Sequence, residues 1–410
     1  MKKRNLGLGL VLSGLVFIAG CQSDLSGDTT TKEAVIIAES ESVSESENQS
    51  QYESESESES ESASIPAIPV LTELKDSTLD LEAKVFDRTY NKYATYGDVL
   101  EYIKSQPSDE VIDLHRYHLS IMQQLDILAI SDNVEYAWFV DIDGVTVDSD
   151  ATEIVISEHD IKSKEYTIDD IISLLPNIKR IEMCNCGYTN DEMAEICDSH
   201  PDIRIIWEIV LSHWRIRTDV VAFSTMKTCA QTFYMYNEDA KYLKYCTDLV
   251  ALDLGHNFVT DISFLQYMPE LRILILVDNT KGWENGRHVY LNDLSMLQYT
   301  PKLRYLEFFV GSVRDLSFLQ YTPDIVDLNI SYNPVSDASY LFNLPKLERL
   351  MMEHTNIPYS EYERLVAAYP DAQIEYYGEG SIDHGWREHP RYYAMRDMFK
   401  NNYVNQLFLD

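Results

Sequence analysis

Apolar residues recur at a fixed spacing through the C-terminal half of the chain. Five segments share the pattern L-x-x-L-x-L, with occasional conservative replacements, and they begin at Leu249, Leu271, Leu303, Ile325 and Leu347. The steps between them are 22, 32, 22 and 22 residues, and the longer step contains an insertion around 281–290. A second set of leucines has the same spacing, at Leu243, Leu265, Leu297, Leu319 and Leu341. Two markers with one shared insertion indicate an internal repeat.

The repeat unit predicts a short strand, then a turn, then a short helix. Its fourth and sixth positions are apolar and alternate with the two-residue period of a strand. Asn257, Asn279 and Asn333 occupy the ninth position, where a side-chain amide can hydrogen-bond buried backbone at a turn. Gly311 and Thr355 replace asparagine in the other two units. Four units continue with an aspartate that we expect to cap a short helix rather than to bind a ligand, because it recurs at one repeat position: Asp261, Asp293, Asp315 and Asp337.

This pattern resembles the 22-residue leucine-rich repeat of internalin-type bacterial surface proteins. The clear match runs from Leu249 to about Tyr377. The resemblance implies an α/β fold, a curved leucine-rich-repeat solenoid whose parallel strands line the concave face. Such a match is specific for the fold and says nothing about the ligand.

Less regular units are expected before the regular ones. Residues 150–248 contain apolar segments that predict strands near 154–156, 178–186 and 203–209, at spacings within the range of this type of repeat. A degenerate unit is expected near 227–248. The segment 207–223 fits no unit, and we interpret it as an inserted hairpin.

Both ends of the repeat stack need cover. Residues 65–149 are assigned to an N-terminal cap, because a helical spacing of apolar residues runs through 96–130. Regular repeats fill 249–378, and residues 379–410 are assigned to a C-terminal capping segment.

The segment 385–399 is aromatic and locally basic in an acidic protein. We expect it to close the last repeat, with Trp386, Tyr393 and Phe399 packed on the stack. A ligand-binding role for Arg387 and Arg391 is the alternative.

The first 64 residues are expected to lie outside the fold. Residues 1–20 have a basic start, an apolar run and small residues before Cys21, which is the layout of a secretory signal peptide. The segment 18–21 resembles the lipobox of bacterial lipoproteins, which implies acylation of Cys21 and a membrane anchor. Residues 21–64, rich in serine and glutamate, predict a disordered tether. The expected location is the extracellular face of a bacterial cell membrane.

Charge excludes one class of partner. The chain has 33 basic and 68 acidic residues and a formal net charge of −35 at pH 7. Contact with nucleic-acid phosphates needs a basic patch, and the field of this protein repels polyanions. We therefore expect no nucleic-acid partner.

Motifs for catalysis or metal binding are few. Residues 141–150 carry four aspartates, but Gly144 is misplaced for a calcium loop and Asp143-Gly144 favours a hairpin. The five cysteines beyond Cys21 show no C-x-x-C spacing, so one disulfide, or a zinc or redox site, is only an alternative to free thiols. No nucleophile elbow, phosphate loop or zinc-protease motif occurs. The sequence predicts a non-enzymatic protein without a cofactor.

The concave face is the expected ligand site. Residues at the fifth, seventh and eighth positions of each unit point away from the leucine core. The middle of this face is expected to expose Ile275, Val277, Phe309, Val310 and Tyr332, which form apolar anchors with a polar rim. Cover by the insertion 281–290 or by a neighbouring segment is the alternative. The candidate ligand-binding residues are Asp253, His256, Ile275, Asp278, Glu307, Phe309, Asn329, Tyr332, Met351, Glu353 and His354.

Three hypotheses for function follow. The leading one is a lipid-anchored surface protein that binds a protein or peptide partner through the concave face. The second is a surface carbohydrate-binding protein, suggested by the 28 tyrosines. The third is an enzyme with an unrecognised site in 65–248.

Overall fold

The computed structural model describes residues 95–105, 111–115, 117–130, 134–211, 213–225, 232–284 and 286–409. The chain divides into two compact units, Met1–Thr78 and Leu79–Asp410, and all described residues belong to the second. The expected signal peptide, Cys21 and the tether lie outside the described residues. Within the described part, no helix has the length and apolar character needed to cross a membrane.

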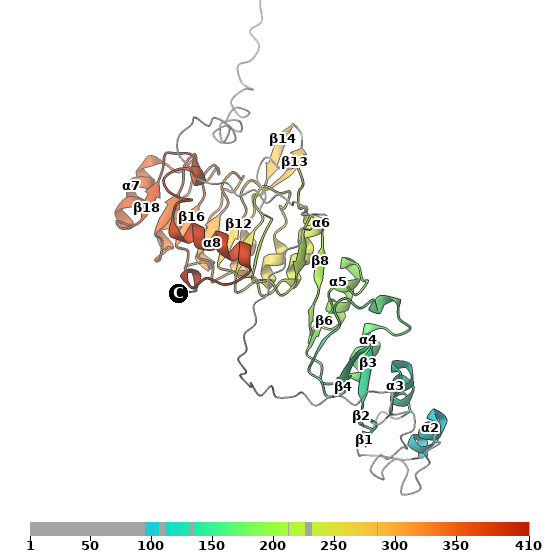
Figure 1. Cartoon of the computed structure of the whole chain (residues 1–410). Helices are drawn as coiled ribbons and strands as arrows, with labels where there is room; N and C mark the ends of the chain where they lie inside the picture. The colour runs from blue at the N-terminus through green and yellow to red at the C-terminus, as the bar shows by residue number, and fades with distance from the viewer. Residues whose placement is uncertain are drawn as a thin grey trace, which may run out of the picture. The chain divides into compact units, whose positions relative to one another are not determined.

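A seven-stranded parallel sheet forms the centre of the repeat region (Figure 1). Its strands in spatial order are β10 (Ala222–Ser224), β11 (Ala251–Asp253), β12 (Ile273–Ile275), β15 (Tyr305–Glu307), β16 (Asp327–Asn329), β17 (Arg349–Met351) and β18 (Gln373–Glu375). Ala251 pairs with Ile273, Tyr305 with Asp327, and Asp327 with Arg349, so neighbouring strands are one sequence period apart. This register confirms a leucine-rich-repeat fold.

The predicted leucines form the core behind this sheet. Leu252, Leu274, Leu306, Leu328 and Leu350 are all fully buried. Short 3-10 helices close each unit on the side opposite the concave face: η3 (Lys241–Tyr245), η4 (Ser263–Tyr267), η5 (Ser295–Tyr299), η6 (Ser317–Tyr321) and η7 (Ser339–Asn343). The second leucine of each period lies in these helices and is also buried.

The repeated aspartates and asparagines take the predicted roles. Asp261 Oδ1 accepts a hydrogen bond from the backbone N–H of Ser263 at 2.9 Å, and Asp293, Asp315 and Asp337 do the same in their units. Asn333 Nδ2 donates to the carbonyls of Phe308, Ile330 and Ser331. Asn257 and Asn279 likewise donate to buried carbonyls. The turns therefore satisfy backbone groups that have no partner within the sheet.

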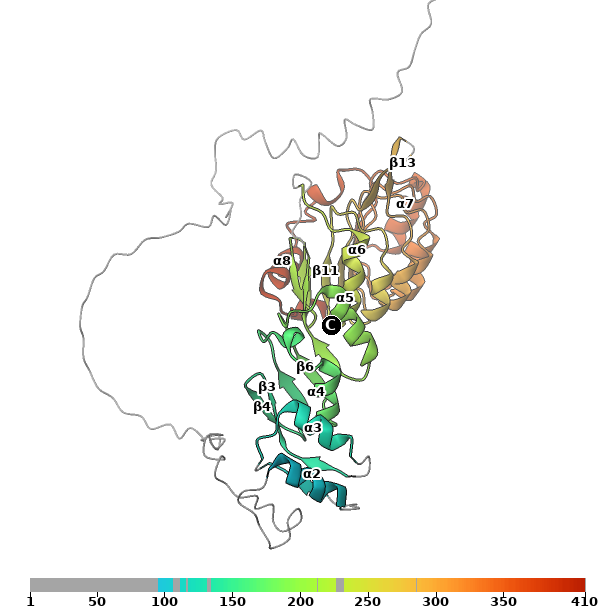
Figure 2. The same ribbon diagram turned by 90° about the vertical axis from the view of Figure 1, so that its right-hand side faces the viewer.

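The insertion is a β-hairpin. Strands β13 (Thr280–Glu284) and β14 (Arg287–Tyr290) pair antiparallel and project from the stack of turns (Figure 2). The hairpin does not cover the strand centres, so the insertion is not what buries them.

A smaller parallel sheet precedes the large one. Strands β5 (Glu153–Val155), β6 (Arg180–Glu182) and β7 (Arg204–Ile206) pair in that order, as the irregular units predict. Helices α4 (Ile168–Leu174) and α5 (Asn190–Ser199), with the 3-10 turn η2 (Ile161–Ser163), connect them. The expected inserted hairpin is formed by β8 (Glu208–Val210) and β9 (Arg215–Arg217). Its expected end at residue 223 is wrong, because Ala222 and Phe223 pair with Ala251 and Leu252 in the large sheet. The next strand of the large sheet is β10, followed by α6 (Asn237–Ala240).

The N-terminal region differs from the expected helix over 96–130. Helices α2 (Tyr96–Ser105) and α3 (Ile121–Leu128) are separated by β1 (Ile112–Asp113), which pairs with β2 (Tyr136–Ala137). Pro107 follows α2 in the sequence and cannot donate a backbone hydrogen bond, and β1 lies within 96–130, so the expectation that this stretch is helical throughout is wrong. The hairpin expected at Asp143-Gly144 is confirmed, because β3 (Phe139–Ile142) and β4 (Val145–Asp148) pair antiparallel around it. Asp143 and Gly144 both have positive φ, as a two-residue turn of this kind requires.

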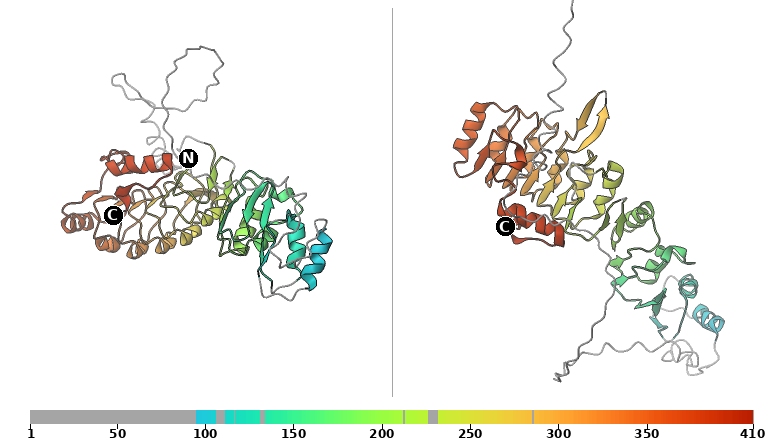
Figure 3. Two further views of the ribbon diagram at one scale, coloured as in Figure 1. Left: turned by 60° about the horizontal axis from the view of Figure 1, so that its bottom comes forward. Right: turned by 45° about the horizontal axis from the view of Figure 1, so that its top comes forward.

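The C-terminal region folds back over the sheet. After α7 (Tyr359–Ala368) and β18, the chain forms η8 (Gly380–Ile382), α8 (Pro390–Asn401) and η9 (Gln406–Phe408). Helix α8 lies on one side of the strands, and the short helices of the repeats lie on the other (Figure 3, left). Trp386 and Phe408 are buried, Phe399 is half-buried, and Tyr393 is exposed. The expectation that this segment packs on the last repeat is therefore corrected: it lies across the concave strands.

Candidate functional site

The centre of the concave face is covered by the C-terminal segment, which we define as residues 386–409. A second apolar cluster, separate from the leucine core, joins this segment to the strands. It includes Ile275, Val277 and Met351 from the sheet, and Trp386 and Met398 from the segment. Ile275 and Val277 are 9% and 6% exposed, so the expectation that they are exposed is wrong.

A network of charged side chains holds the C-terminal segment against the sheet. Arg391 of α8 donates to both carboxylate oxygens of Asp327, from Nε to Oδ2 at 2.6 Å and from Nη2 to Oδ1 at 2.7 Å. Arg349 Nε donates to Asp327 Oδ1 at 2.7 Å, and its Nη1 donates to the carbonyl of Trp386 at 3.1 Å. The Arg349 guanidinium also lies 4.4 Å from the centre of the Trp386 ring. These contacts combine ion pairing with a cation–π interaction in a site removed from water.

Two carboxyl groups beneath the C-terminal segment, those of Asp327 and Glu307, have pKa values shifted in opposite directions. Burial alone would raise the pKa of Asp327, but hydrogen bonds from Arg391 and Arg349 hold that pKa below its usual value. Glu307 is also buried, and burial raises its pKa although Tyr305 and Trp386 donate hydrogen bonds to it. Asp327 is therefore held as a paired anion, whereas the site of Glu307 favours the neutral acid.

The remaining predicted residues divide into covered and accessible groups. Asn329, Met351 and Glu353 are fully buried, and Asn329 Oδ1 accepts from the backbone N–H of Ser331. Asp253 is half-buried, accepts from Ser224 Oγ at 2.7 Å, and has a pKa that burial raises. His354 is exposed. The other accessible candidates are half-buried: His256, Asp278, Phe309 and Tyr332.

The accessible candidates gather at one edge of the sheet. The eighth residue of each regular unit has a left-handed backbone, with φ between 51° and 58°, and we call this set the turn-edge row: His256, Asp278, Val310, Tyr332 and His354. A single non-glycine residue in this conformation is uncommon, and its recurrence follows from the repeated turn. The row places five side chains beside one another, about 4.8 Å apart at the strand spacing.

Several members of the row touch. His256 Nδ1 lies 3.2 Å from Asp278 Oδ2. The rings of Tyr332 and His354 stack with their centres 4.3 Å apart, and Phe309 meets Tyr332 edge-on at 5.6 Å. The row thus has a charged end and an aromatic end.

Exposed aromatic residues flank the row. Trp283 at the tip of the β13–β14 hairpin is 69% exposed, and its ring contacts that of His288 at 4.5 Å. Tyr377, after β18, is 72% exposed. The hairpin tip carries no repeat signal, so periodicity could not identify Trp283 as accessible.

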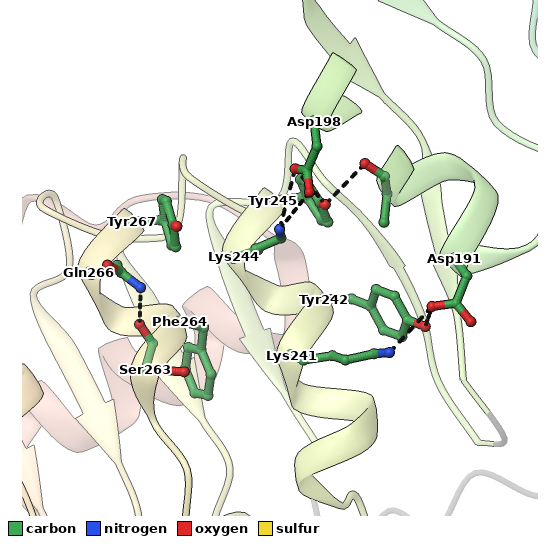
Figure 4. A pocket seen from close by; sticks show the side chains of 11 residues that line it. Asp191, Asp198, Lys241, Tyr242, Lys244, Tyr245, Ser263, Phe264, Gln266 and Tyr267 are labelled. Carbon is green, nitrogen blue, oxygen red and sulfur yellow. Dashed lines mark hydrogen bonds and ion pairs between the residues drawn. The ribbon is translucent and has the colours of Figure 1, made fainter. Parts of the chain in front are cut away.

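A shallow pocket lies where α5 meets η3 and η4 (Figure 4). Its polar side chains pair with one another: Tyr242 donates to Asp191 at 2.6 Å, and Lys244 and Tyr245 both contact Asp198. A polar ligand would have to displace these pairs. We interpret the pocket as the junction between the irregular and the regular repeats.

The cysteines of the described residues show no disulfide and no metal cluster. Cys184, Cys186, Cys197 and Cys246 are free thiols, and these are the cysteines of the described part. Burial raises the pKa of Cys186 and of Cys197 to about 12, so both remain protonated and unreactive at neutral pH. The fifth cysteine beyond Cys21, Cys229, lies outside the described residues.

Sequence reasoning missed Asp327 and Arg349 because it counted only the fifth, seventh and eighth positions as outward-facing. The third position of each unit lies on the same face, since side chains alternate along a strand. The third positions are Ala251, Ile273, Tyr305, Asp327 and Arg349. The ionisable residues Asp327 and Arg349 follow apolar or aromatic residues at this position. That change was the sequence signal that another segment covers the face.

Comparisons with known proteins found solved structures of low sequence identity and low TM-score. No family model matches the chain, and no curated protein matches it. An internalin from Listeria monocytogenes is 15% identical over 68% of this chain and 82% of its own, with a TM-score of 0.33. Internalin C2 from the same species is 16% identical over 55% and 74%, with a TM-score of 0.26. A leucine-rich-repeat protein of Leptospira interrogans is 12% identical over 56% and 55%, with a TM-score of 0.30. The fold assignment rests on the strand register and the buried leucines of this chain.

Proposed function

We propose that this protein is a non-enzymatic, lipid-anchored binding protein of the bacterial cell surface. Its partner is a protein or peptide that docks on the turn-edge row and the adjoining β13–β14 hairpin. The observation that carries this proposal is the stacked Tyr332–His354 pair with Phe309 against it, accessible while the strand centres are covered.

The composition of the row supports a protein partner. Aromatic side chains supply large contact areas at a small loss of conformational entropy, and the His256–Asp278 pair supplies polar contacts beside them. The strongly negative chain favours a basic or neutral partner, because its field accelerates encounter with positive surfaces. Capture should therefore weaken as salt concentration rises.

A photo-crosslinking residue in place of Tyr332 tests the site. Tyr321 provides the matched control, because it is an exposed tyrosine of η6 on the other side of the sheet. We expect a discrete protein adduct in intact cells from position 332 and not from 321. The same adduct should disappear when Phe309→Ala and His354→Ala are added. Identical adducts from both positions, or an adduct that persists in the double variant, would show that the row is not the binding surface.

The lipid anchor is tested separately. Cys21 is the last residue of the lipobox-like segment and supplies the thiol to be acylated. Cys21→Ser should move the protein from the detergent phase to the aqueous phase and abolish incorporation of a labelled fatty acid. Unchanged partitioning would exclude acylation at this residue.

A carbohydrate ligand is the second candidate, favoured by the exposed ring of Trp283 beside His288. Flat aromatic faces in water are suited to stacking against the apolar face of a sugar ring. Binding on a glycan array that is lost in Trp283→Ala, but kept in Tyr332→Ala, would support it over a protein partner.

A further inference from the structure

Three ligand-type side chains converge where the C-terminal region first meets the large sheet. They are Glu353, in the turn after β17, and Asp383 and His384, which follow η8. One carboxylate oxygen from each acid and one ring nitrogen of His384 all lie within 4.8 Å of one another. The three residues come from two parts of the chain about thirty residues apart.

Glu353 is a buried acid, and one of its carboxyl oxygens has no hydrogen-bond partner in the described part of the chain. Its residue is 0% exposed, and the Ser331 hydroxyl donates to Oε2. Its Oε1 is buried and has no hydrogen-bond partner in the described part of the chain. Asp383 Oδ1 is a second buried oxygen in the same state. Buried carboxyl oxygens are nearly always hydrogen-bonded or bound to a cation, so two such atoms at one place indicate a missing donor or cation.

His384 is oriented as a metal ligand would be. Its Nε2 lies 3.4 Å from Asp383 Oδ2, while Nδ1 lies 3.5 Å from Glu375 Oε2. Two ligands with bonds of about 2.1 Å at a tetrahedral angle are about 3.4 Å apart. A histidine that binds metal through one nitrogen commonly places its other nitrogen against a carboxylate, the position that Glu375 occupies.

The backbone also approaches these ligands closely. A Cβ on Gly378 would lie 2.5 Å from His384 Nε2 and 2.8 Å from Asp383 Oδ2, so only glycine fits there. His384 Nε2 donates a hydrogen bond to the carbonyl of Tyr377 at 2.8 Å, and a metal ion on this nitrogen would replace that bond. The Glu379 N–H donates to Asp383 Oδ2 and fixes that carboxylate.

We propose that Glu353, Asp383 and His384 bind a divalent transition-metal ion that fastens the C-terminal segment to the sheet. One imidazole with two carboxylates suits Zn²⁺ or Mn²⁺, whereas Ca²⁺ and Mg²⁺ prefer oxygen ligands alone. His384 lies two residues before Trp386, the buried ring that begins the cover over the concave strands. The ion therefore stabilises the covered state, because the ligands from the two parts of the chain come together only when the segment is seated.

Zinc binding by the full-length protein in detergent, after treatment with a chelator, tests the site. Isothermal titration with ZnCl₂ should show one site, and Zn²⁺ should raise the melting temperature. His384→Ala, Asp383→Asn and Glu353→Gln should each weaken binding at least about 10-fold and abolish the thermal shift. Co²⁺ in place of Zn²⁺ should give absorption bands of nitrogen and oxygen ligation that His384→Ala removes.

A matched control is available in His159. It lies 3.2 Å from Asp143, with 32% and 33% of the two side chains exposed, close to the 33% and 35% of His384 and Asp383. His159→Ala should leave zinc affinity unchanged. The proposal is overturned if the wild type shows no saturable zinc binding below millimolar concentration. It is equally overturned if the His384 and Asp383 variants bind as the wild type does, or if Ca²⁺ binds as tightly as Zn²⁺ in both wild type and His384→Ala.

Discussion

Arg391 donates two hydrogen bonds, of 2.6 and 2.7 Å, to the carboxylate of Asp327, which lies 64 residues earlier in the sequence. Asp327 is 1% exposed and lies in the third position of its repeat, in β16, the strand next to the central one of the seven-stranded sheet. The pair therefore connects the C-terminal helix to the middle of the concave face. This contact explains why the strand residues that were expected to contact a ligand contact the C-terminal segment instead.

Arg391→Ala should strongly destabilise the protein. The substitution leaves Asp327 buried with Arg349 as its remaining cationic contact, and breaking a buried ion pair costs about 3–5 kcal/mol. The free energy of unfolding from urea titration measures this loss. Arg396→Ala on the same helix removes an exposed arginine and should change stability by less than about 0.5 kcal/mol. Equal effects of the two substitutions would contradict the role given to Arg391.

Stability should fall in acid because of Asp327. Its pKa is lowered in the folded state, so the folded protein binds this proton less readily than the unfolded chain does. The resulting stabilisation is present above the ordinary aspartate pKa of about 3.9 and is lost as the pH falls through the lower folded value. Unfolding measured between about pH 6 and pH 2 should show this loss. In Asp327→Asn the corresponding part of the pH dependence should be absent.

Glu307→Gln should show the opposite dependence. Burial raises the pKa of Glu307, so the folded state favours the protonated acid, and its contribution is lost as the pH rises through the folded value. A glutamine keeps an oxygen that can accept from Tyr305 and Trp386 but carries no charge. The variant should be at least as stable as the wild type at pH 7, and this advantage should shrink towards pH 4. An advantage that is independent of pH would mean that Glu307 has the same pKa in the folded and the unfolded chain.

Asn333→Ala should destabilise the repeat turn by at least about 2 kcal/mol. The substitution removes Nδ2, which donates to three buried carbonyls, and the oxygen that accepts from the Val313 N–H at 3.0 Å. Thermal unfolding measures the effect. Asn343→Ala, at an exposed position of η7, should be nearly neutral. A neutral Asn333→Ala would show that water can replace the side chain at this turn.

Local patterns predicted the repeat region well because its contacts are local. The buried leucines, the Asn333 bonds and the Asp261 bond all join residues within one unit or between adjacent units. Each unit contacts mainly its neighbours, so a period in the sequence becomes a period in space. The same reasoning failed at 96–130, where helical spacing of apolar residues hid the strand Ile112–Asp113.

The ligand site was predicted less completely. The turn-edge row contains His256, Asp278, Tyr332 and His354, which repeat register assigned to the concave face and which lie in the turns at its edge. Their ligand remains a prediction. Glu307, Asn329 and Met351 were placed on the correct face but are buried there. For these three residues the alternative is correct: a neighbouring segment covers the concave face.

The sequence by itself determined the repeat, its strand register and the polar groups that close each turn. These follow from side-chain periodicity and from the need to satisfy buried backbone. Only the tertiary structure decided that Trp386 and Arg391 cover the concave face. Their partners Glu307 and Asp327 lie 79 and 64 residues away, beyond the reach of any periodic pattern. Such contacts depend on shape and charge matching between separate segments, which appear only after the chain has folded back on itself.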